Sequence, residues 1–145
     1  MAVAAPTASS GKVVIRNIGL LLSGDIDQPI LEADTIVVQD GKIAAVGKAK
    51  DCDTEGADTV IDCRHTCVAP GLIDSHVHPV AGDWTPRQSQ LNWIESMMHG
   101  GVTTMVSAGE VHYPGRPKDI VGLKALAITA QRAFDAFRPG GVKVL

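Results

Sequence analysis

The chain has 145 residues, of which 45% are hydrophobic and 20% are charged, a composition typical of a soluble globular protein with a buried core. Thirteen Lys and Arg residues against 16 Asp and Glu residues give a formal charge of −3. That charge is too small and of the wrong sign for a protein that binds by neutralising phosphates, so we expect no nucleic-acid partner.

The amino-terminal residues and the cysteines indicate the cellular location to expect for the protein. Residues 1–11 are small and lack periodicity, which predicts a disordered tail rather than a secretory signal. No apolar run approaches the roughly 20 residues that a membrane-spanning helix needs. Cys52, Cys63 and Cys67 do not form a disulfide framework. We therefore expect a cytoplasmic protein with free thiols and no membrane partner.

Residues 12–69 predict a series of short strands. Apolar, β-branched runs separated by turn residues occur at Val13–Ile15, Leu20–Leu22, Thr35–Val38, Ile43–Val46 and Thr59–Ile61. Between the third and fourth runs, Asp40 and Gly41 both tolerate positive φ, which is the pattern of a tight β-hairpin.

After residue 70 the pattern changes to strands that alternate with helices. The first strand is expected over Leu72–His78, and a helix follows with Thr85 as N-cap, Pro86 in its first position and Gln88 completing a capping box. Gly100 and Gly101 end that helix. The remaining elements are a strand over Val102–Val106, a helix that begins near Pro117 with an apolar stripe at Leu123, Ala127, Ala130, Phe134 and Phe137, and a strand over Val142–Leu145. This order is typical of parallel βαβ units, whose ligand sites lie beyond the carboxyl ends of the strands.

Two histidines end the first of these strands. Positions two apart in a strand project to the same side, so His76 and His78 present two imidazoles in one direction. Imidazole is the commonest protein ligand for zinc and related metals, and this arrangement is chelating. A solvated or hydrogen-bonded pair is the alternative for a bare His-x-His. Asp74 lies on the same face, two residues before His76, where it is better placed to accept a hydrogen bond from the site or to hold the strand end than to bind the metal directly.

The run Pro70–His78 resembles the metal-site signature of the amidohydrolase superfamily, and Lys12–Cys67 resembles the small domain that precedes the barrel in those enzymes. The resemblance implies an α/β fold: an amino-terminal β-sandwich segment over residues 12–69, followed over residues 70–145 by the first βα units of a truncated TIM-type (β/α)8 barrel. Other segments resemble the enamidase-like members, which hydrolyse a cyclic enamide. These are Ser23–Asp25, Ala33–Val38, Gly100–Thr104 and His112–Asp119.

One departure separates the chain from dihydroorotases, which carry an arginine close behind the second histidine. Here the first arginine after His78 is Arg87. Arg116 lies in the loop after the second barrel strand together with His112, and we expect this pair to contact substrate, with the Arg116 guanidinium on a carboxylate. An exposed loop arginine is the alternative.

The resemblance further implies hydrolysis of an amide C–N bond by water activated on a divalent metal. His76 and His78 would bind the metal, expected to be zinc, in one or two copies, with iron or manganese as alternatives. The substrate would be a small cyclic amide and the complete enzyme a homo-oligomer. The catalytic aspartate and the other ligands are expected on later strands, because Asp119 and Lys143 do not match their positions.

The remaining histidines have simpler interpretations. His99 is expected to interact favourably with the carboxyl end of its helix. His65, between Cys63 and Cys67, lacks the four-ligand spacing of a structural zinc site.

Two hypotheses about function therefore stand. The first is a metal-dependent amidohydrolase of which this chain is the amino-terminal part. The second is a truncated, non-catalytic fragment or partner chain that lacks the remaining metal ligands. Under either hypothesis we expect the 145-residue chain alone to be inactive.

Overall fold

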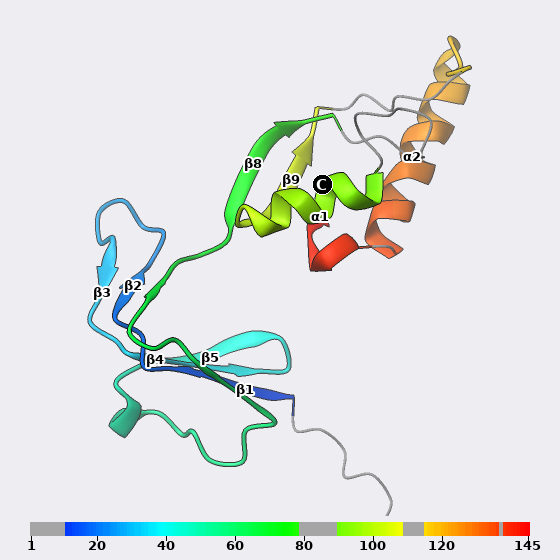
Figure 1. Cartoon of the computed structure of the whole chain (residues 1–145). Helices are drawn as coiled ribbons and strands as arrows, with labels where there is room; N and C mark the ends of the chain where they lie inside the picture. The colour runs from blue at the N-terminus through cyan, green and yellow to red at the C-terminus, as the bar shows by residue number, and fades with distance from the viewer. Residues whose placement is uncertain (1–10, 79–89, 109–114, 137) are drawn as a thin grey trace, which may run out of the picture. The chain divides into compact units, whose positions relative to one another are not determined.

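The computed structural model describes residues 11–78, 90–108, 115–136 and 138–145 (Figure 1). The chain divides into two compact units, Met1–Pro70 and Gly71–Leu145. The expected tail lies outside the described residues except for Gly11, and so do the Thr85 cap and the Pro86 and Gln88 positions expected at the start of the first helix.

The larger sheet of the first unit has four strands in the order β5-β4-β1-β6. Their bounds are Lys12–Arg16 for β1, Thr35–Gln39 for β4, Lys42–Gly47 for β5 and Thr59–Asp62 for β6. β4 is antiparallel to both β1 and β5, and β6 is parallel to β1. The predicted hairpin is confirmed, because β4 and β5 are joined by Asp40 and Gly41 at φ 50° and 76°.

A second sheet in this unit has the order β3-β2-β7, with β2 over Leu20–Leu22, β3 over Ile30–Leu31 and β7 over Cys67–Val68. The two sheets share one hydrophobic cluster, in which Ile18, Leu21 and Ile36 are buried. A short 3-10 helix, η1, spans Ala49–Asp51. The sequence pattern did not predict β3 and β7, because two residues are too few to establish an alternation of apolar and polar positions.

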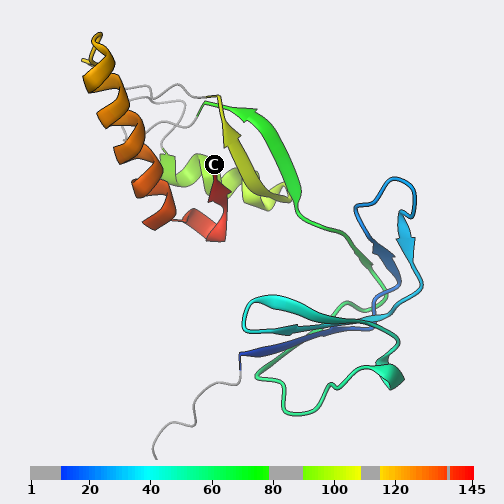
Figure 2. The ribbon, with the colours of Figure 1, turned by 180° about the vertical axis from the view of Figure 1, so that it is seen from behind.

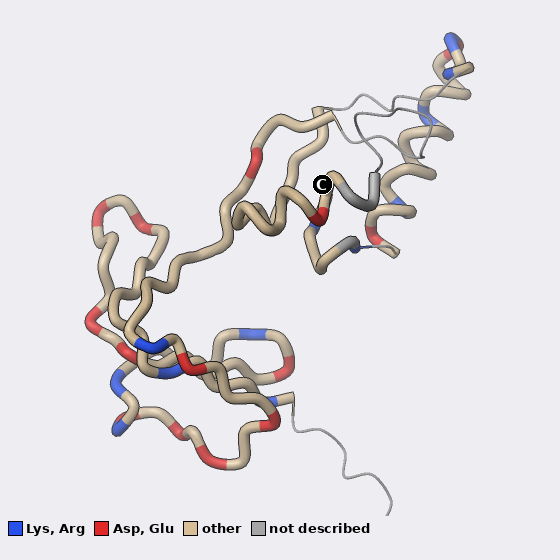
Figure 3. Tube along the Cα trace, viewed as in Figure 1, with Lys and Arg blue, Asp and Glu red and all other residues tan. Residues whose placement is uncertain are grey.

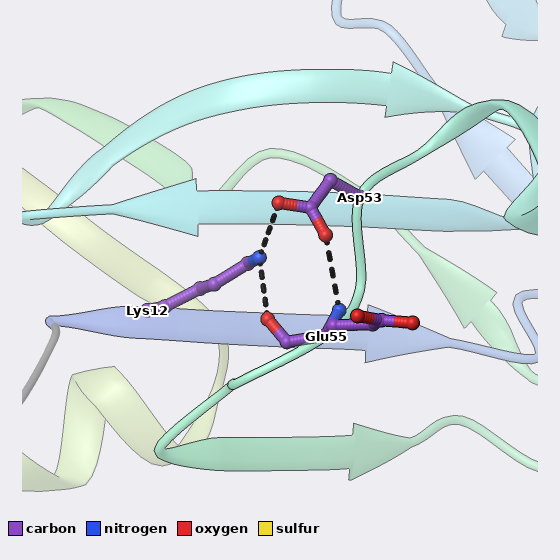
Figure 4. A network of polar contacts seen from close by, with 3 residues as sticks. All are labelled: Lys12, Asp53 and Glu55. Atoms are coloured by element: carbon purple, nitrogen blue, oxygen red, sulfur yellow. Dashed lines mark hydrogen bonds and ion pairs between the residues drawn. The ribbon is translucent and has the colours of Figure 1, made fainter.

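Lys12 holds together parts of the first unit that are far apart in the sequence. Its side chain is buried, and its Nζ donates hydrogen bonds to Asp53 Oδ2 at 2.9 Å and to the carbonyl oxygen of Glu55 at 2.7 Å (Figure 4). The backbone N–H of Lys12 also donates to Asp58 Oδ2 at 3.0 Å. These bonds fasten the segment between η1 and β6 to the first strand. The hydrogen bond from Lys12 is the main cause that lowers the pKa of Asp53.

The second unit alternates strands and helices in the expected order. Its elements are β8 (Leu72–Val77), α1 (Gln90–His99), β9 (Val102–Ser107), α2 (Ile120–Ala136), the short 3-10 helix η2 (Pro139–Gly141) and β10 (Lys143–Val144). The strands form a sheet in the order β10-β9-β8, and both neighbouring pairs are parallel. Figures 1 and 2 show β8 and β9 side by side from opposite directions.

The core of the second unit lies between this sheet and the two helices. Ile94 of α1 and Met105 of β9 are each 0% exposed. The other buried members of the cluster are Val77, Val102, Ala130, Phe134, Val142 and Val144. The elements β8, α1, β9, α2 and β10 therefore each contribute a buried residue to one core.

The apolar stripe expected on α2 is wrong at its amino-terminal end. Leu123 and Ala127 are exposed, whereas the residues that reach the core are Ala130 and Phe134. Helical periodicity predicts which residues share one face of the helix, but it does not predict which part of that face packs against the core. Phe137 lies outside the described residues.

The start of α2 is fixed by a side-chain cap. The helix begins at Ile120 rather than near Pro117, and Asp119 Oδ1 accepts a hydrogen bond from the backbone N–H of Gly122 at 2.8 Å. An aspartate in this position satisfies one of the amides that the first turn leaves without a helical partner.

The charged residues of the first unit are mixed in sign. Figure 3 shows Lys and Arg positions interspersed with Asp and Glu positions along its strands and loops. The first unit therefore has no separate acidic and basic regions along the described part of its backbone.

The buried position of Met105 gives a test of the second core. Met105→Ala should lower the free energy of unfolding by about 2–5 kcal/mol, because it removes buried apolar atoms and leaves a cavity. Val121→Ala, at an 78% exposed position of α2, should change it by less than about 0.5 kcal/mol. Urea unfolding measures both values, and equal effects of the two substitutions would contradict this core.

The lowered pKa of Asp53 predicts a pH dependence of stability. Ionised Asp53 stabilises the fold above its ordinary pKa of 3.8, and this contribution is lost as the pH falls through the lower folded-state pKa. Asp53→Asn should therefore unfold more easily at neutral pH and lose less stability than the unmodified chain on acidification to about pH 2. Urea unfolding across this range measures the difference, and parallel stability curves would argue against the pairing.

Candidate functional site

The carboxyl end of β8 carries the two histidines singled out by the sequence. Val77, between them, is only 4% exposed and belongs to the core of the second unit. Because successive side chains of a strand point to opposite faces, His76 and His78 project away from that core. His76 is exposed and His78 is half-buried.

The two imidazole rings contact each other. Their centroids lie 5.2 Å apart, and the ring planes meet at 69° in an edge-to-face arrangement. The Nδ1 atom of His78 is shielded from solvent. The structure thus brings together two nitrogen-donor rings at the carboxyl end of β8, His76 exposed to solvent within the strand and His78 half-buried directly after it.

Asp74 contacts the backbone of the first histidine. Its side chain is half-buried, and Oδ1 accepts a hydrogen bond from the backbone N–H of His76 at 3.1 Å. Sequence reasoning expected Asp74 to accept a hydrogen bond, and the structure shows that the donor is the backbone N–H of His76. The sequence carries a pattern for this bond, because an aspartate side chain often accepts a hydrogen bond from the backbone N–H two residues later, as in an Asx turn.

The start of β8 is set by a close approach to β9. An added Cβ at Gly71 would lie 2.0 Å from Thr103 Oγ1 and 2.7 Å from Thr103 Cβ. The backbone N–H of Leu72, the next residue, donates to the carbonyl oxygen of Gly101 at 2.9 Å. Sequence reasoning missed this contact, because it depends on which residue of β9 lies opposite.

The other residues expected at the site are not brought to it by any described contact. Arg116 is exposed in the segment between β9 and α2, and His112 lies outside the described residues. Their contact with substrate stays a prediction. His99 is the last residue of α1, and its favourable interaction with the helix end likewise stays a prediction.

The cysteine-rich segment lies in the first unit. Cys63 is half-buried against the cluster around Ile18, Cys67 is exposed, and the thiols of these two and of Cys52 are free. His65 has φ 63°, and its backbone N–H donates to the carbonyl oxygen of Asn17 at 2.7 Å.

A count of donors shows what the His pair offers. Within the described ranges, no three His, Cys, Asp or Glu side chains gather as a metal-binding group. The pair therefore supplies two donors of a coordination sphere.

Among the helices that the structure describes, none is long and apolar enough to cross a bilayer.

Comparison with known proteins identifies the family. The chain is 54% identical to enamidase from Eubacterium barkeri over 133 residues, which is 92% of this chain and 34% of the enamidase. A crystal structure of enamidase, described as a new member of the amidohydrolase superfamily, matches with a TM-score of 0.81 and 51% identity over 92% of this chain and 34% of that one. The chain belongs to the amidohydrolase superfamily.

Other relatives agree with this membership at lower identity. An imidazolonepropionase from Paenarthrobacter aurescens is 36% identical over 101 residues, which is 69% of this chain and 24% of that protein. An allantoinase from Salmonella choleraesuis is 31% identical over 108 residues, which is 74% of this chain and 23% of that protein. The chain thus spans about one third of the enamidase and about one quarter of these two enzymes. No protein-family model matches it.

Proposed function

We propose that this chain supplies the first two metal ligands, His76 and His78, of a metal-dependent hydrolase that cleaves the C–N bond of a cyclic amide or enamide. The observation that carries the proposal is the pair of imidazole rings, 5.2 Å apart, at the carboxyl end of a parallel strand. Ligand sites of parallel α/β folds lie at this edge. The similarity to an enamidase supports the reaction class.

The distance between the rings fits a shared metal ion. With zinc–nitrogen distances of about 2.1 Å, and about 1.1 Å from each nitrogen to its ring centre, two imidazoles on a tetrahedral ion have centroids about 5.2 Å apart. The observed separation is 5.2 Å. Imidazole nitrogen is a donor that zinc, iron and other divalent transition metals accept. The two residues therefore fit this group by donor chemistry, their rings lie close enough to share one ion, and zinc is the metal that we propose.

A divalent ion held there would polarise the scissile carbonyl and lower the pKa of water, which supplies the nucleophile for amide hydrolysis. The task of this chain is to hold and orient the ligands. Because Val77 is packed in the core, the backbone that carries both rings is fixed on one side. Neither histidine has to be recruited from a separate loop, so little conformational entropy is lost on binding.

The proposed site needs donors beyond the two histidines at the end of β8. Two imidazoles leave a metal short of the three protein ligands that catalytic zinc sites use, and the described residues form no group of three. Among the described residues, this shortage of donors favours the second candidate function for the chain by itself, a truncated, non-catalytic fragment or partner chain that lacks the remaining metal ligands. We propose that the relatives' remaining length carries the additional ligands and the catalytic aspartate.

Metal binding is the direct test of the His pair. In the 145-residue chain, His76→Ala combined with His78→Ala should weaken zinc or cobalt binding by more than about tenfold, since even outer-shell changes at metal sites cost 10–100-fold. His99→Ala, in α1 of the same unit, is the matched control and should leave binding unchanged. Isothermal titration calorimetry measures both, and equal affinities of the double variant and the unmodified chain would refute the site.

Turnover tests whether the 145-residue chain by itself holds a working site. The 145-residue chain, loaded with zinc, should not hydrolyse 6-oxo-1,4,5,6-tetrahydronicotinate, the cyclic enamide substrate that the resemblance to the enamidase-like members implies, because two ligands do not complete the coordination sphere. The loss of substrate is followed by chromatography. Metal-dependent turnover that disappears in His76→Ala would show that the chain holds a working site and would remove the non-catalytic candidate.

A further inference from the structure

The register of β8 against β9 changes between Asp74 and Val77, an interval that includes His76. Asp74 lies opposite Met105 and Val77 lies opposite Ser107. Two residues of β8, Ser75 and His76, therefore occupy the interval that the single residue Val106 occupies on β9. This is the two-against-one count of a β-bulge, which bends a strand and changes the direction of its side chains.

The bulge coincides with a convergence of the two rings. Residues two apart in a regular strand are separated by about 6.6–6.8 Å along the strand, and side chains that stand parallel keep that spacing. The imidazole centroids are only 5.2 Å apart. The ring centroids therefore lie more than 1 Å closer together than parallel side chains on a regular strand would place them.

Asp74 is bonded to the residue at the centre of this irregularity. Its carboxylate accepts the backbone N–H of His76 at 3.1 Å, so the extra residue of the bulge has a local hydrogen-bond acceptor. On the far side, Val77 is fixed in the core, and its carbonyl oxygen accepts the N–H of Ala108 at 2.8 Å. The backbone of His76 is thus held from both sides.

We propose that Asp74 is a positioning residue for the metal site: by accepting the His76 N–H it holds the bulge that inclines the His76 ring toward His78. The inference rests on the proposed function for the role of the two rings, but the backbone arrangement itself needs no metal. The relevant property of Asp74 is its short acceptor oxygen and not its charge. An asparagine at this position keeps that oxygen, an alanine removes it, and a glutamate moves it by one methylene.

The experiment compares four variants of the 145-residue chain. Asp74→Ala and Asp74→Glu should weaken cobalt binding by about 10–100-fold, the range for residues that orient metal ligands, and should alter the visible spectrum of bound cobalt. Asp74→Asn should retain the affinity and the spectrum. Ser75→Ala, on the adjacent exposed residue, is the matched control and should change neither. Circular dichroism checks that each variant folds.

A second measurement does not depend on metal. In nitrogen–proton spectra of the metal-free chain, the His76 amide proton should shift upfield in Asp74→Ala and stay near its original position in Asp74→Asn. If the unmodified chain binds no cobalt, the proposed function fails while this amide shift still tests the positioning role. The inference is overturned if the His76 amide does not respond to Asp74→Ala, if Asp74→Glu binds cobalt normally, or if Asp74→Asn binds as weakly as the alanine variant.

Discussion

Burial of Val77 is the constraint on which the candidate site depends. Its side chain is packed with Ile94 and Met105 in the core of the second unit, so the strand cannot rotate without exposing apolar surface. Each buried methylene contributes about 0.8 kcal/mol, and that free energy fixes which face of β8 is turned away from the helices. The two histidines on either side of Val77 acquire a common direction from this packing, before any ligand is present.

The site could be predicted from sequence to the extent that it depends on local periodicity. The period of two in a strand is enough to place His76 and His78 on one side, and Asp40-Gly41 is enough to define a hairpin, because both patterns involve residues close in the chain. The bulge after Asp74 is different. It is defined by the register of β8 against β9, and the sequence of β8 alone does not determine which residue of β9 lies opposite each of its residues.

Non-local packing also explains the other differences. Lys12 is a charged residue at the start of an apolar run, and it is buried in a position where its side chain pairs with Asp53, 41 residues away. Helix α2 has apolar residues along most of its length, but only its second half reaches the core, through Ala130 and Phe134. In both cases the residue type indicates what is compatible with burial, and the tertiary partner decides whether burial occurs.

The contact between Gly71 and Thr103 has a consequence for how the segment tolerates change. Threonine is stiff about χ1, so it cannot move aside for a side chain at position 71, and any larger residue there would push apart the beginning of two paired strands. Five residues later the requirement changes from volume to donor chemistry at His76. Two different requirements therefore limit substitutions in the segment from Gly71 to His78: steric fit at its first residue and the type of donor atom at its last residues. A larger residue at position 71 would disturb the pairing of β8 with β9, whereas replacement of a histidine would remove a nitrogen donor and leave that pairing intact.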